Sequence, residues 1–324
     1  MKTTRFMAAG GALTALTALA TLIAPGANAA PLPRAHGFAV DCAFSHTGPD
    51  DPIVMPGMSG MSHQHEFFGN TSTNSTSTGS SLLAAGTTCQ DPNDKSAYWV
   101  PALYWNGTRV EPRSAHVRYA VTGPEVTPFP AGFMAVTGRT DSTATWSCVV
   151  PGGQPSTSGS VASVPTCSGA EHLVASIIFG DCWDGSSLDS ANHASHLVAS
   201  TNGACPSDHS VRVPQVTLSI NYPAFVTGGS GVTLASGSAA TLHGDMFEAW
   251  ANDGLTARLT SPPPGGGQGG PGQPRMQPGP QPGQQPGGPQ AGQQPPPPPP
   301  GAQPGPQGPG QGRPQGPGAP PPRR

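Results

Sequence analysis

The sequence predicts a mainly β protein: a single β-sandwich or jelly-roll-like domain with long loops, few helices, three disulfides and a disordered C-terminal tail. Short stretches rich in Val, Ile, Tyr and Trp alternate with Gly, Pro, Asn and Ser clusters, as strands alternate with turns. Helical periodicity is scarce, which argues against a parallel α/β fold with crossover helices. Six cysteines, an even count, are typical of an exported, disulfide-stabilised domain.

The N-terminal segment, residues 1–29, reads as a signal peptide. Lys2 and Arg5 give it a positive start, Phe6 to Ala24 is an apolar run, and Ala27-Asn28-Ala29 is an A-x-A cleavage signal. We therefore expect a secreted, extracellular protein, with association with the cell wall as a variant of this prediction. After cleavage no stretch is apolar enough to predict a membrane span.

The rest of the chain divides into a predicted secreted His-rich β domain, residues 30–260, and a tail, residues 261–324. The tail consists almost entirely of Pro, Gly and Gln and has nothing to bury, so it is predicted to be disordered. All 17 acidic residues but only 8 of the 14 Lys and Arg fall in the domain, giving it a net charge near −9. A domain this acidic is a poor nucleic-acid binder. We expect a monomer.

The strands are predicted from local composition and alternation. In the clearest one, Val216, Leu218 and Ile220 alternate with polar residues. Asn106-Gly107 predicts a hairpin turn, and one helix is expected over Met246 to Arg258 with Asp245 at its start. The predicted strands are Ala97 to Trp105, His116 to Ala120, Phe133 to Thr137, Thr145 to Val150, His172 to Phe179, Val213 to Tyr222 and Val232 to Ala235.

The six cysteines allow fifteen disulfide pairings. We favour neighbours in sequence, because each such bond closes a loop of moderate size. Thiolate metal ligands are the alternative, disfavoured because no C-x-x-C occurs. The favoured pairs are Cys42 with Cys89, Cys148 with Cys167 and Cys182 with Cys205.

Histidines gather in three segments and suggest a metal site. His63 and His65 would point to one face of an extended strand. His193 and His196, three apart, would share a face of a helical turn, and His243 would add a ligand from a distant segment. We predict His63, His65, His193 and His243 as metal ligands. Imidazoles suit a divalent transition metal, with Zn and Cu as candidates.

Carboxylates beside these histidines are the candidates for acid–base work. We assign catalytic roles to Asp184, Asp189, His196 and Asp245, as acids, bases or groups that orient a ring. A hydrogen-bonded structural network and metal-free recognition of sugars or acids are alternatives. Neither H-E-x-x-H at helical spacing nor a G-x-S-x-G elbow occurs, which disfavours those metalloprotease and serine hydrolase classes.

Three motifs carry a family resemblance: "HQHEFFGN", "DCWDGSSLDSANHASH" and "HGDMFEAW". In this order the chain resembles a family of secreted domains of unknown function from actinobacteria and filamentous fungi, over nearly all of Val40 to Leu259. The sequence departs from the pattern at Glu66, where Asp is commoner, and at Met246, where Phe is expected. The matching positions are His63, His65, Phe67, Phe68, Gly69, Asp181, Trp183, Asp184, Asp189, His193, His196, His243 and Asp245.

The resemblance implies no activity, but fungal members often accompany carbohydrate-binding modules, which favours a carbohydrate setting. Our leading hypothesis is therefore a secreted domain that acts on or at extracellular or cell-wall polysaccharide, by metal-assisted or acid–base glycan cleavage at the His/Asp cluster. The alternative is a non-enzymatic cell-envelope or glycan-binding protein. Both an enzymatic and a binding role remain open at this point.

Overall fold

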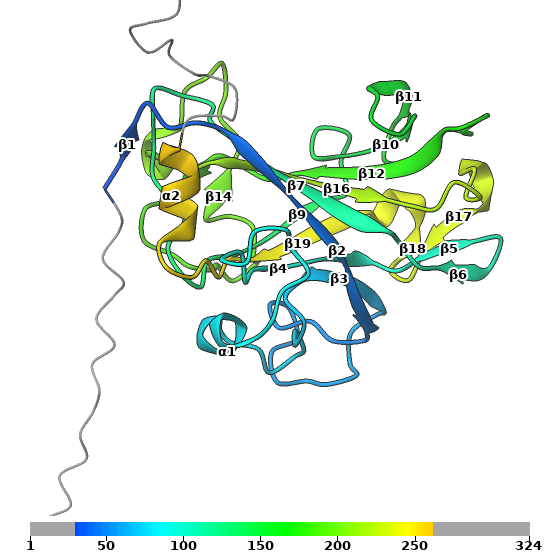
Figure 1. Ribbon diagram of the computed structural model, residues 1–324, viewed down its shortest axis with the longest axis horizontal. Helices are drawn as coiled ribbons and strands as arrows, with labels where there is room; N and C mark the ends of the chain where they lie inside the picture. Colours follow the sequence, from blue (N-terminus) through cyan, green and yellow to red (C-terminus); the bar gives the residue numbers. More distant parts are fainter. Residues whose placement is uncertain (1–29, 262–324) are drawn as a thin grey trace, which may run out of the picture. The chain divides into compact units, whose positions relative to one another are not determined.

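The computed structural model describes residues 30–261, which confirm the mainly β prediction (Figure 1). The predicted signal peptide and tail lie outside the described residues. Among the described residues, helix is limited to α1 (Gly79–Ala84), α2 (Gly254–Thr260) and three 3₁₀ turns. None of these helices has the length and apolar character needed to span a membrane.

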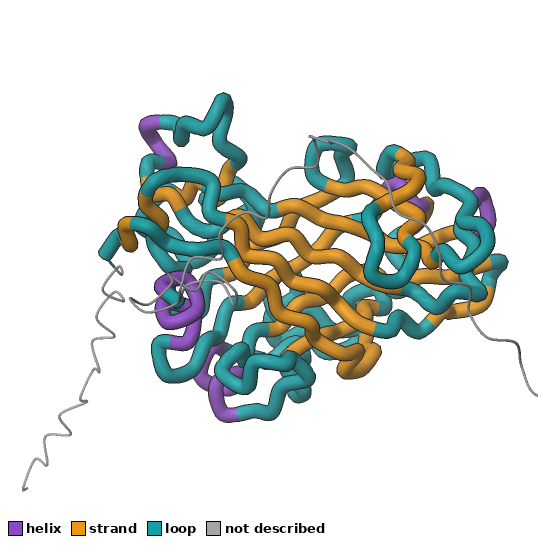
Figure 2. Tube along the Cα trace, turned by 45° about the horizontal axis from the view of Figure 1, so that its top comes forward, coloured by secondary structure: helices purple, strands orange, loops and turns teal. Residues whose placement is uncertain are grey.

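A ten-stranded antiparallel sheet dominates the domain, and its strands run side by side in Figure 2. Several strands of this sheet match predicted ones to within a few residues. In spatial order they are β11 (Pro155–Gly159), β10 (Ala144–Val149), β12 (His172–Ile178), β16 (Gln215–Asn221), β7 (Ser114–Ala120), β2 (Phe38–Gly48), β3 (His65–Gly69), β4 (Ala97–Pro101), β19 (His243–Phe247) and β9 (Met134–Gly138).

Three small sheets complete the domain. The hairpin predicted at Asn106-Gly107 is confirmed, because it joins β5 and β6 and both residues have positive φ. One sheet pairs β1 (Leu32–Pro33) with β8 (Glu125–Val126). A second orders β14 (Leu197–Val198), β13 (Cys182–Trp183) and β15 (Val211–Arg212), and the third β18 (Gly237–Ser238), β17 (Val232–Leu234), β5 (Leu103–Trp105) and β6 (Thr108–Val110).

Strand β2 makes the large sheet curl into two facing halves. Its first half pairs with β7 and its second half with β3, and the register shifts between Phe44 and His46. A bulge of this kind bends a strand. The sheet returns on itself so that β12 contacts β9, and Gly244 of β19 lies against Ile177, where a Cβ would meet the Ile177 side chain at 3.2 Å.

The main core lies between the two halves. The predicted alternation in β16 is confirmed, since Val216, Leu218 and Ile220 are fully buried there. A smaller core lies on the opposite face of β3, β4 and β19, where Phe67, Trp99 and Phe247 pack with Leu82 of α1. Helix α1 accordingly lies beside β3 on the side away from β16 (Figure 1). This second face carries the candidate site.

The predicted helix over Met246 to Arg258 is wrong in its first half. Met246 and Phe247 belong to β19, Asp245 lies in the middle of that strand rather than at a helix start, and helix begins only at Gly254. Strand pairing overrides the helical periodicity, because β19 has hydrogen-bonded neighbours on both sides, β4 and β9. The predicted strand from Ala97 to Trp105 is likewise divided between two sheets at Ala102.

The three disulfides are the predicted ones: Cys42–Cys89, Cys148–Cys167 and Cys182–Cys205. All six cysteines are therefore oxidised, which rules out the alternative of thiolate metal ligands. Such bonds are typical of oxidising compartments. Cys42–Cys89 joins β2 to the loop that follows α1, and both cysteines are part of the main core.

A buried acid pair in the main core predicts how stability depends on pH. Burial raises the pKa of Asp94 to about 7 and that of Glu248 to about 8. Tyr98 donates to Asp94 at 3.1 Å and Tyr119 donates to Glu248 at 2.8 Å. The folded state thus keeps protons that the unfolded chain releases near pH 4, so these groups add stability at low pH that is lost as pH rises to about 8.

We expect Glu248→Gln to flatten this pH dependence. In metal-free protein, the free energy of unfolding should fall less between about pH 5 and about pH 8 than in wild type, by up to about 1.4 kcal/mol per pH unit for one proton. Denaturant unfolding across this range measures the slopes. Glu125→Gln, which removes an exposed carboxylate, is the matched control and should keep the wild-type slope. Equal slopes for wild type and Glu248→Gln would contradict this interpretation.

Candidate metal centre and adjoining pocket

Strand pairing brings the first and last histidine motifs together. His65 lies opposite Pro101 of β4. Asp245 lies opposite Trp99, and the same antiparallel register places His243 next to Pro101 on the other side of β4. His65 and His243 therefore sit in one row of the sheet, on either side of a proline, and His63 lies two residues before His65, the first residue of β3. His65 and His243 are about 180 residues apart in the sequence, but in the sheet only strand β4 lies between them.

The three imidazoles of His63, His65 and His243 form one cluster. The ring centroids are 4.2 Å apart for His63 and His65, 5.2 Å for His63 and His243, and 6.0 Å for His65 and His243. One ring nitrogen from each lies within 4.8 Å of the other two, an arrangement that can hold a metal ion. Three of the four histidines predicted as metal ligands thus lie together, and the fourth, His193, is not in this cluster.

Hydrogen bonds to main-chain oxygens fix two of the rings. His65 Nδ1 donates to the carbonyl oxygen of Asp50 at 3.0 Å, and His243 Nδ1 donates to that of Thr241 at 2.8 Å. Because a carbonyl only accepts, both protons sit on Nδ1 and the Nε2 lone pairs are free in the neutral rings. The Nε2 atoms of His63 and His65 are buried and have no hydrogen-bond partner. This is the tautomer that a metal ligand needs.

The surroundings keep the three rings uncharged. Burial lowers the pKa of His243 to about 4. Burial, together with the two neighbouring imidazoles, lowers the pKa of His65 well below its ordinary value, and burial and Arg139 lower that of His63. Neutral imidazoles bind cations without first releasing a proton. The cluster is therefore ready to accept a metal at neutral pH.

Asp245 adds a buried carboxyl group beside the rings. It is fully buried, and neither of its oxygens has a hydrogen-bond partner. Its Oδ2 lies 4.0 Å from His243 Nε2. Burial, and the nearby Asp51 carboxyl, raise the pKa of Asp245 well above its ordinary value. Burying a polar group without a hydrogen-bond partner destabilises the folded state, so we expect a cation or a water molecule to contact this carboxyl group.

A pocket of about 390 Å³ opens beside the cluster, and it is lined by both polar and apolar side chains. Its size is at the lower end of small-molecule sites. Gly138 forms the closest approach to the cluster, with φ of 130°, and a Cβ there would lie 2.5 Å from the Cα of His243. The lining residues are Val54, Val136, Thr137, Gly138, Arg139, Asn192, His193, Ala194 and His243.

His193 also lines this pocket and is not part of the three-ring cluster. Its Nδ1 is 2.9 Å from Asp189, which leaves Nε2 available for another contact. Its main-chain oxygen accepts from Val136, so the segment 188–193 covers the outer edge of β9. His193, predicted as a metal ligand, thus lines the pocket outside the three-ring cluster, and Asp189, assigned a catalytic role, binds its Nδ1.

His196 and Asp184 lie in other surroundings. His196 is buried, with Nε2 donating to the Met134 carbonyl at 2.7 Å and Nδ1 accepting from Ser190 at 2.9 Å, so both ring nitrogens are already bonded. Asp184 accepts from the main-chain N–H groups of Ser186 and Ser187, both at 2.8 Å, as in an Asx-turn. The hydrogen bonds of His196 and Asp184 therefore stabilise the conformation of the loop.

The helical turn expected over the second motif does not form. Residues 190–196 make turns, and His193 has φ of 58°, in the left-handed region. His193 and His196 therefore have different partners in place of a shared face.

Several further motif positions support the fold around the site. Glu66 is buried and pairs with Arg109 at 2.7 Å, and Asp181 is buried and pairs with Arg212 at 2.7 Å. Phe67 and Phe68 are completely buried on opposite faces of β3, and Trp183 is buried in the main core. Their contacts are with protein groups.

Three residues that sequence reasoning missed belong to the site: Asp51, Arg139 and Asn192. Asp51 accepts from the N–H groups of Ile53 and Val54, both at 2.9 Å, and is buried. Arg139 and Asn192 line the pocket. All three stand in loop-like sequence, where no local pattern indicates that they belong to a site.

Fold and site together define an antiparallel β protein with three disulfides and a buried histidine cluster next to a pocket. The chain belongs to the family described as Domain of unknown function (DUF1996), which matches residues 51–250. That span contains all three histidines of the cluster. Neither the curated proteins nor the solved structures include a match to the chain.

Proposed function

We propose that this is an exported transition-metal protein in which His63, His65 and His243 hold the ion, and that it acts on extracellular or cell-wall polysaccharide. The observation that carries the metal proposal is the set of buried ligand atoms without partners. The Nε2 atoms of His63 and His65 and both oxygens of Asp245 have no hydrogen bond. Zn(II) and Cu suit such a donor set.

The residues present fit a metal with an open coordination position. Three protein ligands, His65 and His243 on strands and His63 just before one, leave room for water or substrate, as in catalytic zinc sites. A bound ion would supply Lewis acidity or an activated water. Asp245, beside His243, is placed to balance the charge of the ion. Its protonated form in the metal-free protein would give up its proton when the ion enters.

The pocket beside the cluster supplies the groups that a polar substrate needs. His193, held by Asp189, is a base with a defined orientation whose Nε2 can take or return a proton. Arg139 and Asn192 offer hydrogen-bond donors, and Thr137 an additional hydroxyl. A pocket of about 390 Å³ with this lining suits one or two sugar rings of a longer chain. Together these features support metal-assisted or acid–base cleavage of a glycan.

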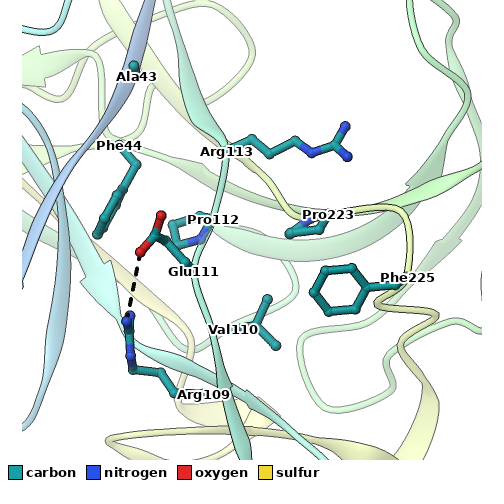
Figure 3. A pocket seen from close by; sticks show the side chains of 9 residues that line it. All are labelled: Ala43, Phe44, Arg109, Val110, Glu111, Pro112, Arg113, Pro223 and Phe225. Atoms are coloured by element: carbon teal, nitrogen blue, oxygen red, sulfur yellow. Dashed lines mark ion pairs between the residues drawn. The ribbon is translucent and has the colours of Figure 1, made fainter.

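A second pocket supports the alternative, glycan binding without cleavage. It has a volume of about 560 Å³, and Phe225, 64% exposed, forms one side of it. Figure 3 shows Phe44 and Phe225 on opposite sides of this pocket, with Pro112 and Val110 between them and Arg113 nearby. Exposed aromatic rings are suitable surfaces for the CH faces of sugars, and Arg113 for their hydroxyls.

One experiment separates cleavage from binding. Metal-loaded protein is incubated with insoluble cellulose, chitin and β-glucan, and both released sugars and retained protein are measured. Cleavage predicts released products, lost in His193→Ala and kept in Phe225→Ala. Binding alone predicts retention without products, lost in Phe225→Ala. If neither products nor retention occur on any glycan, the polysaccharide proposal is wrong, while the metal proposal is judged by metal content alone.

A further inference from the structure

The loop that leads into the histidine cluster carries an unusual set of methionines. Residues 55–61 read "MPGMSGM", so three of the eight methionines in the chain stand within seven residues. They are Met55, Met58 and Met61, and His63 follows two residues later. We call residues 55–61 the methionine loop.

Two consecutive turns give the methionine loop a regular backbone. The N–H of Met58 donates to Met55 O at 3.1 Å, and that of Met61 donates to Met58 O at 3.2 Å. Gly57 and Gly60, the third residue of each turn, have φ of 74° and 75°. These are the marks of type II turns, which place the first and fourth Cα atoms within about 7 Å. The three methionines therefore occupy the successive corners of a double turn.

Main-chain and side-chain contacts hold the double turn against the site. Gly57 N–H donates to Ser75 O at 2.7 Å, and Ser62 N–H donates to Pro49 O at 3.1 Å. Gly60 N–H donates to Asp50 Oδ1 at 3.2 Å. Asp50 also receives the His65 Nδ1 hydrogen bond on its carbonyl oxygen. One residue thus joins the methionine loop to a ring of the cluster.

The methionine side chains face solvent instead of filling the core. Met61 is 63% exposed and Met58 is 47% exposed, while Met55 is partly buried. Val54 is exposed beside them. A single exposed apolar residue is ordinary, but methionines repeated at the corners of a double turn need a reason. A thioether sulfur is a soft ligand, and soft ligands select Cu(I).

We propose that Met55, Met58 and Met61 form a Cu(I) site at the entrance to the histidine cluster. The ion binds the thioether sulfurs by exchange for water, with no change of oxidation state. Binding at the methionine loop stands independently of the histidine centre. The further step, ligand exchange of copper from sulfur to the imidazoles, rests on the proposed function and makes copper the metal of that centre.

The test measures Cu(I) affinity of the full chain under anaerobic conditions, by competition with bicinchoninate. Replacing Met55, Met58 and Met61 by Leu, which keeps apolar volume, should lower the Cu(I) bound in this competition by one ion per chain while leaving Zn(II) binding unchanged. The control is Met246→Leu, because Met246 is fully buried and its sulfur is not accessible to the ion. An unchanged number of bound Cu(I) ions in the triple variant would overturn the proposal.

The same measurement in a chain with His63→Ala and His243→Ala keeps the two proposals apart. Cu(I) binding that persists there, and disappears on adding the three Met→Leu changes, assigns the site to the methionine loop whatever the histidines do. Loss of all Cu(I) binding in the histidine variant, with the methionines intact, would contradict an independent thioether site. If the proposal of a histidine metal centre is wrong, the wild-type protein will bind neither Zn(II) nor Cu(II), which is measured separately.

Discussion

Replacing His63 and His243 by Ala should weaken Zn(II) or Cu(II) binding by more than about 100-fold, beyond the loss expected when only a hydrogen-bond partner behind a ligand is removed. Wild-type protein should bind one such ion per chain. The variant keeps a single imidazole of the three whose nitrogens lie within 4.8 Å of one another. Isothermal titration of metal-free protein measures both values.

The control for this prediction is His172→Ala. His172 lies on β12, where its Nε2 is 3.1 Å from Asn221 Oδ1. The control variant therefore removes an imidazole that is not part of the cluster. The metal affinity of the His172→Ala variant should equal that of the wild-type protein. Thermal unfolding of each metal-free variant checks that the fold persists. A folded double variant that still binds the ion tightly would show that these histidines are not the ligands.

Trp99→Ala should destabilise the metal-free domain by about 3–5 kcal/mol, the range for truncating a buried aromatic residue. Trp99 is completely buried in the smaller core, with its ring 5.6 Å from that of Phe67, and it lies opposite both Phe67 and Asp245 in the sheet. The cavity left behind would lie directly under the site. We therefore expect weaker metal binding as well, because the strands that carry His65 and His243 lose their common support.

Trp105→Ala is the comparison for this second prediction. Trp105 lies on β5 outside the ten-stranded sheet, is only partly buried, and donates through Nε1 to Gly228 O at 3.2 Å. Its truncation should cost less stability and leave metal affinity unchanged. Denaturant unfolding and metal titration of both variants measure the two effects. Equal losses of metal affinity in the two variants would contradict a specific role for Trp99 beneath the site.

The sequence was sufficient for the features that depend on local pattern. Alternation in β16 and the Asn106-Gly107 turn both predict the observed structure, because each is set by neighbouring residues. The disulfide pairs also follow from short loop closure. The long strand β2 was missed, since polar residues such as Asp41, Ser45 and His46 interrupt its apolar character. It forms nonetheless because its first half pairs with β7 and its second half with β3.

The candidate site was predictable in part for the same reason. The His-x-His spacing predicts two neighbouring rings, and the rings of His63 and His65 do lie together, although only His65 belongs to β3. That His243 meets them depends on β4 lying between β3 and β19, a pairing of distant segments that no local pattern contains. The roles of Asp51 and Arg139 were invisible for this reason too. In the second motif, turn geometry separates His193 from His196, where spacing alone suggested a shared helical face.

X-ray absorption at the metal edge of protein loaded with one equivalent of Cu(II) tests the central claim most directly. We expect the multiple-scattering signature of about three imidazoles, at metal–nitrogen distances near 2.0 Å. The same spectrum recorded after His63→Ala and His243→Ala should lose that signature. A wild-type spectrum made of oxygen ligands alone, or failure of the wild-type protein to retain the ion through desalting, would contradict the three-histidine metal centre.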